Sequence, residues 1–244
     1  MRTAAILPVK RFTRAKRRLG GSVAEPLRLQ LARAMVSDVL LALARTTSIE
    51  LMIVVTCEGS VARDAGALGA LVVEDAAEAG QSEAAELGVR RALDAGLDRV
   101  LCVPGDCPAL DPAELDVLLA PNPDAEGRDA EGRGGVAREV VIVPDRHGTG
   151  TNGLLLSPPD AIAPSFGPGS FERHRGLALA AGLPCRVERP GSLLLDIDTG
   201  ADLAALRALR SARSMGANEP LGPNTRAVLA RAAEAGAPRV TISA

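Results

Sequence analysis

The 244-residue chain is predicted to fold as a single α/β domain, in which a mostly parallel sheet lies between two layers of helices, α/β/α. Two observations predict this class. Short apolar runs, of the kind that buried strands need, alternate along the chain with segments of helical periodicity. Such alternation is typical of βαβ units, whose crossover helices cover both faces of a parallel sheet. The length also suits one domain with a full hydrophobic core.

The predicted strands are short apolar runs that end at a proline, a glycine or a polar residue. They cover residues 3–8, 51–56, 70–73, 100–103, 139–143, 154–157 and 193–199, with a last short strand at 239–242. The predicted helices cover residues 24–45, 61–68, 83–95, 200–211 and 225–235, and a further one begins after Asp111. Ser82, Asp111 and Ser170 are the predicted N-caps of three helices, because their side chains accept hydrogen bonds from free backbone N–H groups.

Composition excludes several classes of protein. The net charge is −2 and the chain has no Trp or Tyr, which argues against a nucleic-acid surface. No apolar run is long enough to span a membrane, and the N-terminal one is too short for a signal peptide. The four cysteines lack C-x-x-C spacing, so neither a zinc site nor a disulfide framework is indicated. We therefore expect a soluble, cytoplasmic protein; the oligomeric state stays open, and a homodimer is one of the states allowed.

Three aspartates form a candidate metal site. Asp106 follows the apolar run 100–103 at once, after Pro104 and Gly105, so it is expected at the carboxyl edge of the sheet, where open α/β sheets bind ligands. Asp196 and Asp198 lie at the end of the predicted strand 193–199, where residues two apart face the same side. Carboxylate oxygens suit Mg²⁺, so the three side chains predict a site for one or two such ions. The alternative is that these aspartates serve only turns and helix caps.

A basic segment follows the first predicted strand. Residues 9–19 contain six basic side chains, including Lys10 and Lys16, which are the only lysines in the chain. A lysine side chain carries a compact point charge. Because the segment follows the first predicted strand, it is expected at the carboxyl edge of the sheet, where it can contact an incoming triphosphate. The alternative is an ordinary solvated basic surface.

The segment 148–153 matches the G-x-G-x-x-G dinucleotide fingerprint but is predicted not to bind a nicotinamide cofactor. That fingerprint requires a helix to begin within it, whereas an apolar strand and two prolines follow here. The segment instead predicts a hairpin loop whose backbone N–H groups, with Thr149 and Thr151, can bind an anion. The Gly-Pro-Gly turn before Ser170 is a second candidate anion site at a helix start. The only histidines, His147 and His174, flank these two loops.

Five segments, in this order, resemble the phospholactate/phosphoenolpyruvate guanylyltransferases, the CofC/FbiD family. They are LPVKRFTRAKRRL, VPGDCPAL, PDRHGTGTNGLLL, FGPGSFERH and LLLDIDT. The resemblance covers about residues 1–210. It implies a guanylyltransferase domain at 1–212 with a nucleotidyltransferase-like fold, and leaves residues 213–244 as a C-terminal extension without an assigned role.

The resemblance also implies a reaction and a set of site residues. GTP would react with a small phosphorylated acid, phosphoenolpyruvate or 2-phospho-L-lactate, and release pyrophosphate, in biosynthesis of the deazaflavin coenzyme F-420. The matching positions are Asp106, Asp196 and Asp198 for Mg²⁺, Thr151, Gly167 and Ser170 for the acceptor acid, and Lys10, Lys16 and Arg18 for the GTP phosphates. Gly80 and Ser82 match the place where guanine is held, although Gly-Gln-Ser stands there in place of the common Gly-Leu-Asn or Gly-Leu-Ser.

Two other functions compete with this one. Asp196-Ile197-Asp198 satisfies the D-x-D metal motif of glycosyltransferases of related fold, although only a short tail follows the motif here. A non-catalytic nucleotide-binding module would use the same anion sites without turnover.

Overall fold

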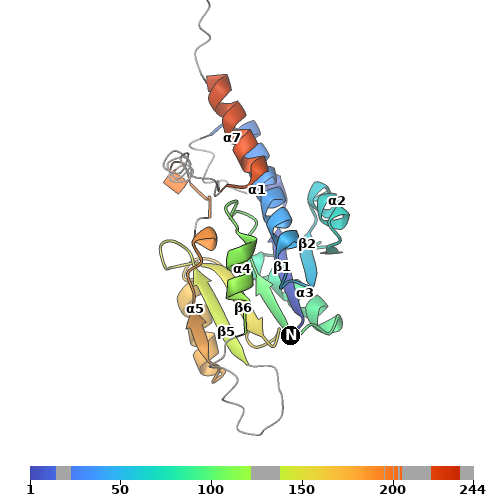
Figure 1. Cartoon of the computed structure of the whole chain (residues 1–244), viewed down its shortest axis with the longest axis vertical. Coiled ribbons are helices and arrows are strands. Elements are labelled where there is room, and N and C mark those ends of the chain that lie inside the picture. The colour runs from blue at the N-terminus through green and yellow to red at the C-terminus, as the bar shows by residue number, and fades with distance from the viewer. Residues whose placement is uncertain are drawn as a thin grey trace, which may run out of the picture.

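The computed structural model describes residues 1–14, 23–121, 138–194, 196–199, 201–202, 204 and 221–236 (Figure 1). None of the helices in these ranges combines the length and the apolar character that crossing a membrane would require.

The described strands form one seven-stranded sheet with the order β3-β2-β1-β4-β6-β5-β7. They are β1 Thr3–Val9, β2 Leu51–Thr56, β3 Leu71–Val73, β4 Arg99–Cys102, β5 Glu139–Pro144, β6 Thr151–Ser157 and β7 Cys185–Val187. Within this sheet β6 runs antiparallel to both of its neighbours, and the other pairings are parallel. The predicted, mostly parallel sheet is therefore confirmed.

From β1 to β5 an α-helix separates each strand from the next along the chain, as in βαβ units, whereas β6 follows β5 directly. The α-helices and the short 3-10 helices have the following bounds. They are α1 Glu25–Arg45, α2 Gly59–Ala67, α3 Gln81–Asp94, α4 Pro112–Leu118, α5 Ser170–Ala180 and α7 Pro223–Gly236, with short 3-10 helices η1 Phe12–Arg14 and η3 Gly191–Leu193. Asp111 caps α4 as predicted, because its side chain accepts from the Ala113 N–H at 2.9 Å.

Helices cover both faces of the sheet, as β1 illustrates. Its residues alternate between two hydrophobic cores because successive side chains of a strand point to opposite faces. Ala5 and Leu7 pack with residues of α1, α2 and α4, whereas Ala4 and Ile6 pack with residues of α3 and α5. The three-layer α/β/α arrangement is thus confirmed (Figure 1).

Helix α7 packs along α1 and belongs to a third core (Figure 1). The carboxylate of Asp38, in α1, accepts from the backbone N–H groups of Asn224 and Thr225 at 2.9 and 2.8 Å, so it caps α7 from another helix. The Gly222 N–H donates to the Pro108 carbonyl at 2.8 Å, which ties the start of α7 to the turn after β4.

Three sequence predictions about local structure are wrong. The segment 193–199 is not a strand: η3 occupies its start, and residues 196–198 have no regular structure. An apolar run of this length does not by itself distinguish a strand from another buried segment. Ser82 and Ser170 are not N-caps, since Gly80 and Gly169 hold those positions and each serine hydroxyl pairs with another residue.

Some predictions fall on residues that the structure does not describe. They are Lys16, Arg18, most of the loop 121–138, most of the helix 200–211 and the strand 239–242.

Candidate active site

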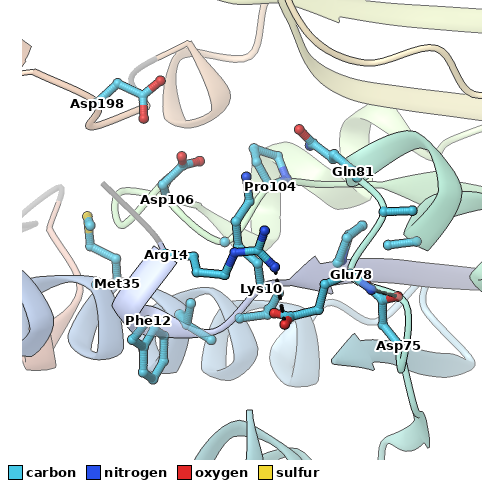
Figure 2. Close-up of a pocket in the computed structure, with 18 residues that line it drawn as sticks. Lys10, Phe12, Arg14, Met35, Asp75, Glu78, Gln81, Pro104, Asp106 and Asp198 are labelled. Atoms are coloured by element: carbon cyan, nitrogen blue, oxygen red, sulfur yellow. Dashed lines mark hydrogen bonds and ion pairs between the residues drawn. The ribbon is translucent and has the colours of Figure 1, made fainter. Parts of the chain in front are cut away.

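A cavity of about 530 Å³ opens at the carboxyl edge of the parallel strands (Figure 2). Lys10 follows β1, Asp75 follows β3 and Asp106 follows β4, and all three line the cavity. Figure 2 shows Asp106 and Asp198 on one side of the view, Asp75, Glu78 and Gln81 on the other, and Lys10 and Arg14 between them. The cavity therefore has one end at Asp106 and Asp198, called the acidic end here, a basic middle, and a second end at the start of α3 that also carries two carboxylates.

The turn that presents Asp106 is packed tightly against α1. A Cβ atom at Gly105 would lie 3.0 Å from the Val36 Cγ2 atom, closer than ordinary van der Waals contact. The absence of a side chain at Gly105 lets the chain turn directly under the helix, and Asp106 then faces the cavity. The Asp106 carbonyl accepts from the Ile197 N–H at 3.1 Å, so the turn after β4 is joined to the segment that carries Asp196 and Asp198.

The three aspartates predicted to bind a metal lie near one another, with Asp196 and Asp198 on an irregular segment in place of the predicted strand. Asn152, in β6, donates through Nδ2 to the Leu193 carbonyl at 2.8 Å and to Asp196 Oδ1 at 3.1 Å. Burial raises the pKa of the Asp196 carboxyl, and the negative charges of Asp106 and Asp198 raise it further. Among the described residues, no three acidic, histidine or cysteine side chains already form a metal cage. The aspartates are thus close enough to interact electrostatically but are not arranged as a complete set of ligands.

The residues predicted to hold the acceptor acid form a second cluster beside β6. The hydroxyls of Thr151 and Ser170 lie 3.2 Å apart, and Thr151 Oγ1 lies 3.0 Å from Nδ1 of the buried His174. His174 Nε2 accepts from the Ser165 N–H at 2.8 Å, so the neutral ring carries its proton on Nδ1 and donates it to Thr151. Burial, followed by the charge of Arg173, lowers the pKa of His174 to about 4. The imidazole is therefore neutral at physiological pH.

The turn before α5 is fixed by its own backbone and by one arginine. Gly167 and Gly169 have positive φ angles of 105° and 72°, a conformation that glycine adopts readily. The Arg173 guanidinium donates to the carbonyls of Ser165 and Phe166 at 3.0 Å and also to that of Pro168. Gly167 itself accepts from the Ser170 N–H through its carbonyl at 3.0 Å. The turn is thus held in one shape next to the Thr151 hydroxyl.

The described part of the basic segment is held by a carboxylate. Glu78 Oε2 lies 3.5 Å from Arg11 Nε and 3.4 Å from Arg14 Nη1, and Glu78 Oε1 accepts from the Arg11 N–H at 3.3 Å. Lys10 is exposed and lines the cavity. An anionic side chain already binds to this loop, so its geometry suits an anion.

One of the two predicted guanine-binding positions lines the far end of the cavity. Gly80 lines the cavity at the start of α3. The Ser82 hydroxyl accepts from the Phe166 N–H at 2.8 Å and so connects α3 to the turn before α5.

Sequence reasoning missed Asn152, Asp75 and Glu78. Asn152 stands directly after Thr151 in the G-x-G-x-x-G segment, whose motif is defined by glycines and leaves this position unspecified. Asp75 and Glu78 follow a short strand at the carboxyl edge, which is the same signal that identified Asp106. His147 lies exposed on the hairpin loop, whereas His174 is fully buried, and the sequence did not distinguish the two.

The chain is similar in sequence to known guanylyl transferases. Residues 3–210 match the family model described as guanylyl transferase CofC like. A phosphoenolpyruvate guanylyltransferase of Conexibacter woesei is 48% identical over 222 residues, which cover 91% of this chain and 95% of that one. One of Sphaerobacter thermophilus is 37% identical, over 84% of this chain and 93% of that protein.

Solved structures show the same fold at low identity. A protein of Desulfovibrio desulfuricans, provisionally assigned as a nucleotide-diphospho-sugar transferase, superposes with a TM-score of 0.68 at 18% identity, covering 96% of each chain. A cytidylyltransferase of Leptospira borgpetersenii gives a TM-score of 0.52 at 15% identity, covering 96% of this chain and 95% of that one. The predicted nucleotidyltransferase-like fold is confirmed. The chain is a nucleotidyltransferase, and it belongs to the CofC-like guanylyl transferase family.

Proposed function

We propose that this enzyme transfers GMP from GTP to phosphoenolpyruvate and releases pyrophosphate. One observation carries the proposal: a single cavity is lined by Asp106, from the β4 turn, and Asp198, from the D-x-D segment, at one end and by Lys10 in its middle. Two curated relatives that align over most of their length are named phosphoenolpyruvate guanylyltransferases, which favours this acceptor over 2-phospho-L-lactate. The product would enter biosynthesis of coenzyme F-420. Membership in a guanylyl transferase family leaves no support for the glycosyltransferase alternative.

The chemistry requires no nucleophile from the protein. An oxygen of the acceptor phosphate attacks the α-phosphorus of GTP and forms a new P–O bond, while the bond from the α-phosphorus to the bridging oxygen breaks and pyrophosphate leaves. Charge accumulates on phosphate oxygens during this exchange. Catalysis therefore depends on alignment of the two reactants and on preorganised positive charge, for which Lys10 is placed in the cavity and Lys16 and Arg18 are the further candidates.

The three aspartates fit a magnesium ion by the chemistry of their donor atoms. Asp106, Asp196 and Asp198 supply carboxylate oxygens, and Mg²⁺ prefers a few carboxylates together with substrate phosphates to a complete protein cage. Bound Mg²⁺ would supply positive charge to the phosphates of GTP and to the leaving pyrophosphate. Asn152 orients Asp196 for this role.

The acceptor acid would bind at Thr151, Gly167 and Ser170. Thr151 Oγ1 accepts from His174 Nδ1 and from the Ser170 hydroxyl, so its own proton is available for an oxygen of the acid. His174 thereby positions the Thr151 hydroxyl as a donor. Its neutral state also avoids the cost of a buried, unpaired charge.

Pyrophosphate release tests the proposal. Purified protein is incubated with GTP and Mg²⁺, and phosphoenolpyruvate, 2-phospho-L-lactate and 3-phosphoglycerate are added separately. We expect release with phosphoenolpyruvate, and a loss of 100-fold or more in Asp106→Asn and Asp196→Asn, in line with the loss on removing one electrostatic group that stabilises a transition state, about 10²–10³-fold. Asp64→Asn, at a half-exposed aspartate of α2, is the matched control and should keep full activity.

Each other outcome has a definite meaning. Release with a different acid alone would retain the reaction and change the acceptor. Tight GTP binding without release with any acid would favour the binding module and overturn the proposed function.

A further inference from the structure

We propose that Asp75 selects guanine over other bases by accepting hydrogen bonds from the N1–H and 2-amino groups of GTP. The proposal rests on the proposed function. It assigns the guanine base to the end of the cavity opposite Asp106 and Asp198. Asp75 lies directly after β3 and lines the cavity, although only 6% of its surface is exposed.

The Asp75 carboxylate has unused hydrogen-bonding capacity inside the cavity. Its Oδ1 atom accepts from the Glu78 N–H at 3.0 Å, and no described residue donates to its Oδ2 atom. A carboxylate can accept about four hydrogen bonds, and Asp75 lines the cavity, so a ligand bound there can donate to it. A ligand with two adjacent donors would satisfy it.

Glu78 is the other carboxylate at this end and is already occupied. It accepts from the Arg11 N–H and pairs with the guanidinium groups of Arg11 and Arg14. It therefore belongs to the basic loop rather than to the base. Asp75 has no such cationic partner among the described residues. It is therefore the carboxylate that is available to accept hydrogen bonds from a neutral base.

The position of Asp75 in the sheet agrees with a nucleotide laid across the carboxyl edge. The strand order places β3 three strands from β4, or roughly 14 Å at the usual strand spacing. Lys10, after β1, lies between the two ends (Figure 2). With the phosphates near Asp106 and Lys10, the base reaches the end of β3, where Asp75 and Gly80 line the cavity.

A carboxylate at this place discriminates among bases by their hydrogen-bonding edges. Guanine offers two adjacent donors, N1–H and the 2-amino group, and two carboxylate oxygens can accept both. Hypoxanthine lacks the 2-amino group, and adenine presents an acceptor at N1. Xanthine carries a carbonyl oxygen at position 2, which a carboxylate would repel.

The test compares GTP, ITP, XTP and ATP as substrates of the wild type and of Asp75→Asn. In the wild type we expect kcat/KM to be about 10-fold lower with ITP than with GTP, and 100-fold or more lower with XTP and ATP. The reason is that each hydrogen bond to a charged group changes kcat/KM about 10- to 100-fold. In Asp75→Asn the value for GTP should fall about 10- to 100-fold. The value for XTP should rise above that for GTP, because the new amide donates to the xanthine 2-carbonyl oxygen.

Two controls separate base recognition from general damage. Glu74→Gln changes the neighbouring exposed carboxylate and should leave the preference and the rate unchanged. Glu78→Gln should lower activity with all four nucleotides by the same factor, because it alters the basic loop and not the base contact.

Two results would overturn the inference. One is a wild type that uses GTP and ITP equally well. The other is an Asp75→Asn variant that loses GTP and XTP activity in parallel. Failure of the wild type with all four nucleotides would instead count against the proposed function.

Discussion

At the scale of single residues, the site depends on groups whose protonation and orientation are set by burial. His174 is fully enclosed, receives a backbone N–H on Nε2 and donates from Nδ1 to Thr151. Asn152 similarly uses one amide group to fix both the Leu193 carbonyl and Asp196. Neither residue carries the reaction itself, but each determines where a hydroxyl or carboxylate points.

The lowered pKa of His174 predicts a pH-dependent stability. The folded state keeps this histidine neutral down to about pH 4, whereas the unfolded chain protonates it below about 6.5. Its contribution is therefore complete above pH 6.5 and is lost as the pH falls from 6.5 to 4. Between pH 7 and pH 5 the free energy of unfolding should fall by about 2 kcal/mol from this group.

Urea unfolding at both pH values measures the effect. In His174→Leu the loss between pH 7 and pH 5 should be about 2 kcal/mol smaller than in the wild type. His147→Leu, at the exposed histidine, should retain the full loss. An identical pH dependence in the wild type and His174→Leu would contradict the prediction.

At the scale of elements, the ends of helices are held by residues distant in sequence. Asp38 in α1 caps α7 across 186 positions of the chain, and the Ser82 hydroxyl of α3 binds the turn before α5. Sequence patterns do not predict such caps, because they identify only a serine or aspartate that is adjacent in sequence to the helix it caps. The two failed N-cap predictions, at Ser82 and Ser170, have the same cause.

Removal of the Asp38 carboxylate should loosen α7. We expect Asp38→Ala to lower the free energy of unfolding by about 2 kcal/mol, since it leaves the N–H groups of Asn224 and Thr225 without their acceptor. Asp64→Ala removes a half-exposed carboxylate 3.7 Å from Arg33 and should cost under about 0.5 kcal/mol. Thermal or urea unfolding of the two variants measures these losses. Equal losses in the free energy of unfolding would show that the cap does not stabilise the protein.

At the scale of the whole molecule, the C-terminal helix and the acidic end of the cavity share a core. Ile197, between Asp196 and Asp198, is buried in a cluster with Leu31 and Met35 of α1 and Leu221, Val228 and Leu229 at α7. The side chain between the two aspartates is therefore held by the region that the sequence left without a role. The division of the chain at residue 212 stays a prediction.

A smaller side chain in this core should also change the active site. Leu229→Ala should cost about 2–4 kcal/mol of stability, and it should also raise the Mg²⁺ concentration needed for half-maximal activity, because Ile197 loses a neighbour. Leu179→Ala makes the same substitution at a leucine of α5 that is 81% exposed, and it should change neither quantity. A destabilised Leu229→Ala with an unchanged Mg²⁺ requirement would confine α7 to a structural role.

The sequence predicted the fold class, the positions of the central strands along the chain and most helix bounds, because apolar periodicity reports burial directly. It also determined the family, since five motifs stand in a fixed order. Asp106 was predicted correctly as a residue at the carboxyl edge of a strand, because the apolar run and its proline stop are adjacent in the chain.

The contacts between site side chains became visible in the folded molecule alone. It placed Asp196 and Asp198 on an irregular segment held by Asn152 and the Asp106 carbonyl, and it brought Asp75 into the cavity from a short strand three places away from β4. The physical reason is that hydrogen bonds between distant residues and the close approach of packed elements leave no local pattern in the sequence. They exist only once the two cores have formed on either side of the sheet.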